Sequence, residues 1–206
     1  MAKRRARGTA NWIRLPPPRR RGTRSLEEAL TRRRSVYEFA DRPLTDAELA
    51  QLLWAVQGVT SSEGDRTAPS AGALFPLEIY VVTAQGLHHY EPPGHQLRRL
   101  SSRDLREALF DAGLSQEPLL EAPATFLIAA VYRRTEREYG KRWSPRYIHL
   151  EVGHAAQNLL LQAVCLDLSA VPIAAFEEEE VQEALSLPAD HRPLYLIPVG
   201  PLRNDR

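Results

Sequence analysis

The sequence is poor in cysteine and has no long hydrophobic run. Its 206 residues include one cysteine, Cys165, which excludes an internal disulfide framework and a cysteine-based zinc site. The longest apolar run, residues 122–131 with one threonine inside it, is well below the ~18 residues that a membrane span needs. Neither arginine cluster near the start, residues 4–5 or 19–21, is followed by the apolar segment of an export signal. We therefore expect a cytoplasmic protein without a membrane span.

Motifs of several large enzyme classes are also missing. The patterns G-x-G-x-x-G, G-x-x-x-x-G-K-[ST], H-E-x-x-H and G-x-S-x-G do not occur in the chain. Their absence argues against Rossmann-type nucleotide binding, P-loop phosphate binding, zinc proteolysis and serine hydrolysis, and we predict no metal site. With 43% hydrophobic residues, the chain is long enough to bury one core of its own.

Charge is divided unevenly along the chain. The formal net charge is +1, but residues 1–34 carry a net charge of +10 and residues 35–206 carry −9. The basic start could bind nucleic acid or another anionic surface, in which case binding would weaken steeply with salt. It could equally be a solvated or dimer-wrapping extension, which is favoured because it has no nucleic-acid motif and no aromatic residue besides Trp12. We expect residues 1–24 to form a basic arm and residues 25–206 to form one domain.

The pattern of helix and strand signals predicts an α+β fold. Ser25 to Glu28 and Thr45 to Glu48 have the spacing of capping boxes and predict two helix starts, and Gly58 ends the second helix. Helices are also expected at 102–111, 147–166 and 177–185, strands at 77–82, 125–132 and 194–199, and a hairpin at 86–100. Helices and strands do not alternate as regular βαβ units, which argues against a doubly wound parallel sheet.

Two segments contain residues suited to binding a cofactor. In residues 32–39, an Arg-Arg-Ser cluster could hold a phosphomonoester, because guanidinium groups match phosphate oxygens; the same arginines could simply complement a helix C-terminus. In residues 69–76, small residues would let the backbone approach a flat ligand, Gly72 permits unusual dihedral angles and Ser70 can donate a hydrogen bond. An ordinary tight connection explains this second segment equally well.

Three further segments have unusual residues for their context. Residues 151–158 place polar groups in an otherwise apolar helix, where His154 is more typical of a core or interface histidine than of a catalyst. Gly153, in mid-helix, costs about 1 kcal/mol relative to alanine and predicts close packing, such as that of another helix. Residues 171–176 interrupt the chain before an acidic helix start, and residues 198–203 end on Arg203.

Taken in order, these segments resemble the nitroreductase superfamily of FMN-dependent oxidoreductases, and within it the SagB-type, azoline dehydrogenase-like branch. The resemblance extends from about residue 15 to residue 202. It rests on residues 15–18 (Leu-Pro-Pro-Pro), 33–35 with Phe39, 42–45, 69–78, 153–161 and 198–200. Each motif is weak alone, and the order of all of them carries the resemblance.

The resemblance implies a mostly antiparallel sheet flanked by helices, in an intertwined homodimer with FMN at the subunit interface. It implies a ping-pong hydride transfer between a donor, with NAD(P)H as one candidate, and a small organic acceptor. Arg33, Arg34, Ser35 and Arg203 would face the phosphate, residues 69–73 the ring, and the backbone of Ala174 and Ala175 flavin N5. The implied cofactor-binding residues are Arg33, Arg34, Ser35, Tyr37, Pro69, Ser70, Ala71, Gly72, Ala73, Pro172, Ile173, Ala174, Ala175 and Arg203.

Two positions depart from the family pattern. Tyr37 stands where the phosphate motif is usually basic, and Glu138-Tyr139 stands where azole-forming members have a Lys-Tyr pair that removes a proton. Tyr139 is therefore the candidate catalytic residue, but a carboxylate differs from lysine in pKa and charge, which argues against a typical azoline dehydrogenase. Oxidation of azoline-like peptide heterocycles stays open as an alternative, as does use of the fold to store or degrade flavin.

Overall fold

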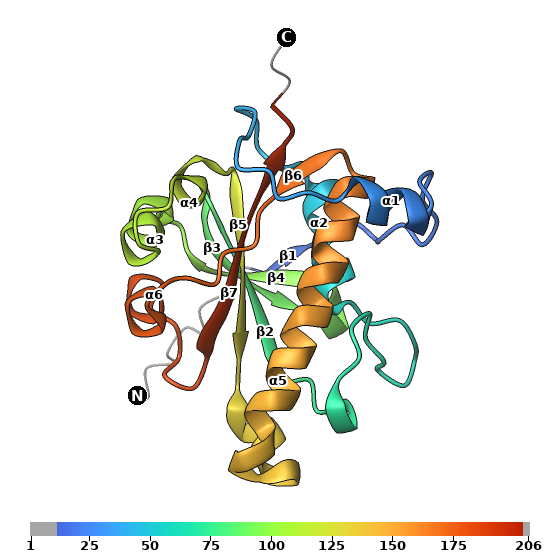
Figure 1. Cartoon of the computed structure of the whole chain (residues 1–206), viewed down its shortest axis with the longest axis vertical. Helices are drawn as coiled ribbons and strands as arrows, with labels where there is room; N and C mark the ends of the chain where they lie inside the picture. The colour runs from blue at the N-terminus through green and yellow to red at the C-terminus, as the bar shows by residue number, and fades with distance from the viewer. Residues whose placement is uncertain (1–11, 204–206) are drawn as a thin grey trace, which may run out of the picture.

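The fold is built on a seven-stranded antiparallel sheet. The computed structural model describes residues 12–203, and the strands run in the order β1-β4-β3-β2-β5-β7-β6 (Figure 1). The strands are β1 (Trp12–Arg14), β2 (Leu77–Thr83), β3 (Gly86–Glu91), β4 (Gln96–Ser101), β5 (Ala124–Ala130), β6 (Leu168–Ala170) and β7 (Arg192–Pro201). The helices are α1 (Leu26–Arg32), α2 (Asp46–Gln57), α3 (Arg106–Ala112), α4 (Glu117–Glu121), α5 (Tyr132–Cys165) and α6 (Glu178–Ala184), with short 3-10 turns η1 (Ala71–Ala73) and η2 (Pro92–Gly94). The expected α+β fold with an antiparallel sheet is confirmed.

Helices cover both faces of the sheet. Successive side chains of a strand point to opposite faces, so on β2 Ile79 and Val81 join the core with α2 and α5, whereas Tyr80 and Val82 join the core with α3, α4 and α6. Strands at the centre of the sheet are therefore apolar on both sides. The expected hairpin is confirmed as β3 and β4, which turn at η2.

The two predicted helix starts differ in detail. At α2, the Thr45 hydroxyl accepts the Glu48 N–H while the Glu48 carboxylate accepts the Thr45 N–H, so this capping box is complete. At α1, the Ser25 hydroxyl accepts the Glu28 N–H, but the Glu28 carboxylate pairs with Arg24 and Arg32 instead of reaching back. Ser25 is thus a helix cap without the reciprocal half of the box.

The long helix α5 starts earlier than the sequence predicts. It begins at Tyr132 and is interrupted at Gly140, whose φ of 72° and ψ of 164° turn the chain between a short first part and the long rod that crosses the sheet (Figure 1). The left-handed φ is easily reached only by glycine. The predicted packing of a helix against Gly153 is wrong for a single chain, because a Cβ there would meet nothing within 4 Å in the described structure.

The basic start of the chain joins the sheet from Trp12 onward. β1 pairs with β4, and Leu15 is buried in the core. Part of the arm expected at residues 1–24 is therefore integral to the fold, whereas residues 1–11 lie outside the described structure. Within residues 12–203, no helix is long and apolar enough to cross a membrane.

Candidate functional site

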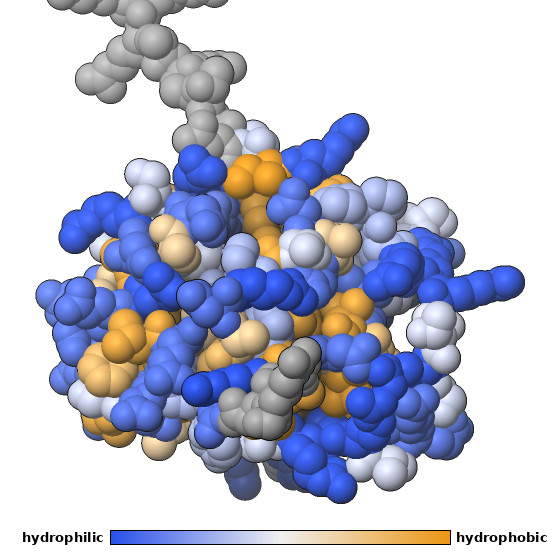
Figure 2. Space-filling view, turned by 90° about the horizontal axis from the view of Figure 1, so that it is seen from above, coloured by the Kyte–Doolittle hydropathy of each residue, from blue (hydrophilic) through white to orange (hydrophobic). Residues whose placement is uncertain are grey.

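One group of predicted site residues gathers beside the β6 edge of the sheet. The segment after α1 runs along this edge, where the Val36 N–H donates to the Ala170 carbonyl at 3.1 Å and Phe39 bridges to Leu202. A cavity of about 540 Å³ opens here, with Tyr37, Ile173 and Arg203 in its wall. Seen from the end where the chain leaves β7, hydrophobic residues reach the surface among hydrophilic ones (Figure 2).

The three consecutive arginines after α1 have different surroundings. Arg32 pairs with Glu28 at 3.0 Å, and Arg34 donates to the carbonyl groups of Thr31 and Arg33, where it complements the helix C-terminus. The Arg33 guanidinium has no hydrogen-bond or ion-pair partner within residues 12–203. Arg33 is therefore the one arginine of this cluster without a side-chain partner in the described part of the chain.

The segment between β6 and α6 offers two backbone donors. Ile173 exchanges both of its backbone hydrogen bonds with Leu196, and the Gln116 side chain donates to the Ala175 carbonyl at 2.8 Å. Ala174 and Ala175 are exposed, and their own N–H groups have no partner in the part of the chain that the structure describes. The segment is thus held firmly on one side while it presents two N–H groups on the other.

A second group of predicted residues forms the loop before β2. Gly72 lies in the left-handed region with a φ of 61°, and the Ser70 hydroxyl oxygen accepts the Phe75 N–H at 3.0 Å. A Cβ at Gly72 would lie 2.8 Å from the hydroxyl of Tyr139. The fold therefore places the candidate catalytic tyrosine directly against the loop predicted to face the flavin ring.

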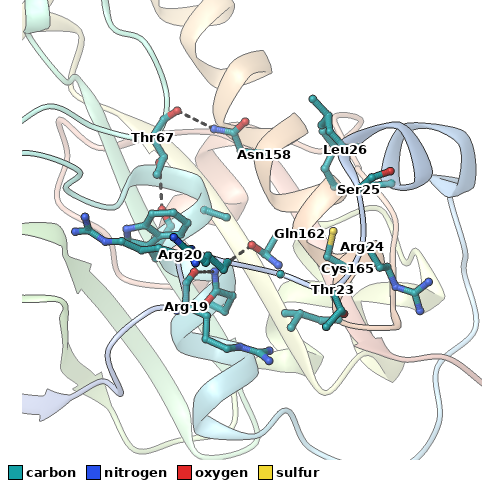
Figure 3. A pocket seen from close by; sticks show the side chains of 18 residues that line it. Arg19, Arg20, Thr23, Arg24, Ser25, Leu26, Thr67, Asn158, Gln162 and Cys165 are labelled. Carbon is teal, nitrogen blue, oxygen red and sulfur yellow. Dashed lines mark hydrogen bonds between the residues drawn. The ribbon is translucent and has the colours of Figure 1, made fainter.

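Side chains from α5 and from the preceding segment hold this loop. The Asn158 side chain donates to the Thr67 carbonyl at 3.1 Å, as the dashed line in Figure 3 shows. Arg134 donates to the Phe75 carbonyl at 2.9 Å, and the Arg66 guanidinium lies 4.8 Å from the centre of the Phe75 ring. Both ends of the loop are thus tied to the body of the protein.

Two carboxyl groups flank the loop, of which Glu78 is partly buried and Glu151 is buried. Glu78 pairs with Arg134 and accepts a hydrogen bond from His89 at 2.6 Å. Burial alone would raise the pKa of Glu78, but the His89 hydrogen bond and the Arg134 charge prevail and lower it.

Glu151 lies on the other side of the loop, on α5. Its side chain accepts a hydrogen bond from the Gln57 amide at 3.3 Å. Burial raises its pKa to about 7, although the neighbouring Ser70, Gln57 and Arg66 act in the opposite direction. Glu151 falls in the polar segment 151–158 of the sequence, where a carboxyl group at a core-facing helix position is the signal that could have marked it. His154 of the same segment is exposed.

A single chain does not bring the two groups of residues together. The β6-edge group lies by the C-terminal end of β7, whereas the loop with Gly72 lies beside the opposite end of α5 (Figure 1). A further cavity of about 430 Å³ separates α2 and α5 from residues 19–26, which Gln51 ties down through both backbone groups of Arg19 (Figure 3). None of the predicted cofactor residues lines this cavity. Among residues 12–203, no three His, Cys, Asp or Glu side chains are grouped to hold a metal ion.

The antiparallel sheet, the long helix on one face and the cavity with Arg203 in its wall define an α+β protein with helices on both faces of one sheet. Residues 30–201 match the Nitroreductase family, and the chain belongs to this family of oxidoreductases.

Three relatives illustrate the breadth of the family. The chain is 43% identical over 181 residues to a Methanocaldococcus jannaschii protein named as a nitroreductase, MJ1384, covering 85% of this chain and 90% of the relative. It is 24% identical to the trifolitoxin operon protein TfxC of Rhizobium leguminosarum bv. trifolii, covering 97% of this chain and 61% of that protein. A crystal structure of a protein named as a nitroreductase from Ralstonia eutropha superposes with a TM-score of 0.85 at 28% identity, covering 94% of this chain and 90% of that one.

Proposed function

We propose that this chain is an FMN-dependent oxidoreductase that transfers hydride by a ping-pong mechanism between a donor, such as NAD(P)H, and a small organic acceptor. The observation that carries the proposal is a cavity walled by Tyr37, Ile173 and Arg203, followed along the chain by Ala174 and Ala175, whose N–H groups have no partner among residues 12–203. Membership of the Nitroreductase family supports it. When bound, FMN would supply the reversible two-electron chemistry.

The residues at this edge fit FMN. Charge-assisted hydrogen bonds from Arg33 and Arg203, with the Ser35 hydroxyl, would hold the phosphate. Arg34 would add its charge from the end of α1, and Tyr37, 60% exposed, would line the cavity instead of adding a charge. The N–H groups of Ala174 and Ala175, after Pro172 and Ile173, would donate hydrogen bonds to the ring, a role that needs a backbone approach free of bulky side chains.

A homodimer would bring the two groups of site residues together. The outward face of α5 carries Trp143, 45% exposed, and Leu150, 52% exposed, together with Gly153. Two copies packed through this face would place the 69–73 loop of one chain (Pro69, Ser70, Ala71, Gly72 and Ala73) near the β6 edge of the other. Sedimentation analysis is expected to give a dimer for the unmodified chain and a monomer for Leu150→Glu.

Oxidation of azoline-like peptide heterocycles is a second candidate activity. It is supported by the contact between Tyr139 and Gly72 and by the similarity to TfxC. The lysine that precedes this tyrosine in azole-forming members is absent, so the general oxidoreductase is preferred. Comparing turnover of a quinone and of an azoline-containing peptide by the same preparation would discriminate the two.

The central test is flavin binding. The purified protein is expected to be yellow and to release FMN on denaturation, whereas colourless protein that cannot be reconstituted would contradict the proposal. Arg33→Ala should weaken FMN binding by roughly tenfold to a hundredfold, because a charge-assisted hydrogen bond contributes about 1.5–3 kcal/mol. Arg32→Ala is the matched control: it removes the neighbouring guanidinium, which is already paired with Glu28, and should leave the affinity within about twofold.

A further inference from the structure

The first turns of α5 form a basic segment within an acidic domain. Residues 133–146, which we call the basic lobe, contain six of the fifteen lysine and arginine residues found in residues 35–206, but two of the twenty-four acidic ones. The formal net charge of the lobe is +4, whereas that of residues 35–206 as a whole is −9. The lobe projects past the sheet at the end where β5 finishes (Figure 1). It therefore reverses the charge of the domain at one place on the surface.

Four of the six cations in the basic lobe have no anion of their own chain beside them. Arg133 pairs with Asp190 at 2.9 Å, and Arg134 pairs with Glu78. The other four are exposed and have no ion pair or side-chain hydrogen bond within residues 12–203: Arg137, Lys141, Arg142 and Arg146. The fold thus gathers four positive charges without neutralising them.

The basic lobe adjoins the loop predicted to face the flavin ring. A Cβ at Gly72 would lie 2.8 Å from the Tyr139 hydroxyl, and the ring centres of Tyr139 and Tyr147 are 4.7 Å apart. Arg137 and Lys141 are each two residues from Tyr139 along the chain. A molecule that reaches the flavin ring from this side of the loop would therefore have uncompensated cations next to it.

Phosphate groups suit such cations. Guanidinium groups bind phosphate oxygens through paired, charge-assisted hydrogen bonds, and a lysine ammonium adds a compact positive charge. The two nicotinamide hydride donors both contain a diphosphate, but NADPH carries a further phosphate on its adenosine ribose. A surface with excess positive charge beside the ring therefore discriminates between the two donors in favour of the more anionic one.

We propose that the basic lobe binds the phosphate groups of the hydride donor and thereby selects NADPH over NADH. The inference rests on the proposed function, which supplies the need for a hydride donor. The binding residues are the four unpaired cations. Their phosphate partners gain and lose no bond when hydride is transferred from the nicotinamide, so the lobe acts on the affinity for the donor.

The expected size of the preference follows from the exposure of these cations. Exposed ion pairs are individually weak, but two or more directed at one phosphate should together favour the phosphorylated dinucleotide by about tenfold. Salt screens charges that are exposed to water. The preference should therefore shrink as the salt concentration rises, and binding of the phosphorylated form should weaken more steeply than binding of the other.

Calorimetric titration of the purified full-length chain with NADP+ and with NAD+ tests the inference. Both ligands are oxidised, so binding is measured without turnover, and NADP+ should bind about tenfold more tightly. The variant Arg137→Gln/Lys141→Gln/Arg142→Gln/Arg146→Gln should lose this preference, with the affinity for NADP+ lowered by roughly tenfold and that for NAD+ by at most about threefold.

A matched control separates the basic lobe from the overall charge of the protein. Arg98→Gln/Arg99→Gln/Arg103→Gln/Arg106→Gln makes the same change in net charge on β4 and at the start of α3, which covers the face of the sheet opposite to α5. This variant should keep the preference for NADP+ within about twofold of the unmodified chain. Thermal unfolding verifies that both variants are folded.

The outcomes distinguish this inference from the proposed function. Equal affinity for NADP+ and NAD+, absence of binding by both, or a preference that survives in the fourfold variant of the basic lobe would overturn the selection of NADPH. FMN binding in the same preparations would leave the proposed function standing in each case. A chain that neither contains nor takes up FMN would overturn the proposed function, while the two dinucleotide titrations would still be read from the heat of binding.

Discussion

Glu78 and Glu151 are two carboxyl groups beside the same loop, and their pKa values are shifted in opposite directions. Both are largely removed from water, yet the pKa of Glu78 is lowered and that of Glu151 is raised to about 7. Glu78 is paired with a guanidinium and an imidazole, whereas the hydrogen-bond donor to Glu151 is the neutral Gln57 amide. Burial is common to both, so the chemistry of the partners decides the charge.

The difference has a consequence for the loop. At the Phe75 end, Arg134 joins the carbonyl group to the Glu78 carboxylate, and this ion pair is present throughout the neutral range. Glu151, by contrast, is a buried carboxyl group whose pKa burial raises to about 7. One carboxyl group should therefore stay ionised throughout the neutral range, and the other should titrate within it.

The largest effect is expected from Glu78→Gln. The variant leaves the Arg134 guanidinium and the His89 imidazole without their anionic acceptor, and the free energy of unfolding at pH 7 should fall by about 3 kcal/mol. Urea denaturation measures this loss. Glu178→Gln is the control, because it breaks an exposed pair with Arg192 and should cost at most about 1 kcal/mol. Equal losses in the two variants would show that Glu78 does not anchor Arg134 and His89.

The pH dependence of unfolding should separate the two carboxyl groups. The lowered pKa of Glu78 contributes stability above pH 4.5 that is lost as the pH falls through its folded value. The raised pKa of Glu151 works in the opposite direction: stability is present below pH 4.5 and is lost as the pH rises to about 7.

Glu151→Gln removes the second of these contributions. Its unfolding free energy should match that of the unmodified chain near pH 5 and exceed it by about 2–3 kcal/mol near pH 8, since a pKa unit corresponds to about 1.4 kcal/mol. Urea titrations at both pH values decide the matter. A variant that is destabilised equally at both would mean that the carboxylate, not the carboxylic acid, suits the site.

Gly72→Ala should destabilise the loop between the two anchors by about 1–2 kcal/mol. An added Cβ meets both the strain of a left-handed φ and the Tyr139 hydroxyl at 2.8 Å. Gly22→Ala is the matched control, because nothing lies within 4 Å of its Cβ position. Thermal unfolding of the two variants gives the comparison, and the expectation is contradicted if both melt alike.

The smallest effect is expected from Asn158→Leu, at about 1 kcal/mol. The variant removes the hydrogen bond to the Thr67 carbonyl, whose net contribution is of this order. Gln157→Leu, at the adjacent exposed position, should change the unfolding free energy by less than about 0.5 kcal/mol. Chemical denaturation at one pH suffices, and similar losses in both variants would show that Asn158 does not anchor the loop.

Much of the fold was predictable from local patterns. Thr45 and Glu48 mark the start of α2, Gly58 marks its end, and the run of β-branched and aromatic residues around Ile79 predicts β2. These signals involve residues within a few positions of each other. The early start of α5 at Tyr132 was not predicted. Gly140 interrupts the helical pattern of the sequence, whereas tertiary packing keeps the segments on both sides of it helical.

The candidate site was predictable in part. The motifs at residues 33–35, 69–73 and 172–175 could be named, and their assignment to FMN stays a prediction. That Arg34 complements a helix end while Arg33 is without a partner could not be predicted, since both have the same chemistry and adjacent positions. The distinction depends on the direction in which α1 ends.

The sequence by itself determined the family, the order of most helices and strands and the segments suited to a flavin, because capping, residue type and motif spacing are local properties. Only the tertiary structure decided that Glu151 and Gln57 meet in the interior, and that one chain separates the two halves of the site. These outcomes depend on contacts between residues far apart in the chain. Burial and partner chemistry at such contacts, which no local pattern records, set the charge of each side chain.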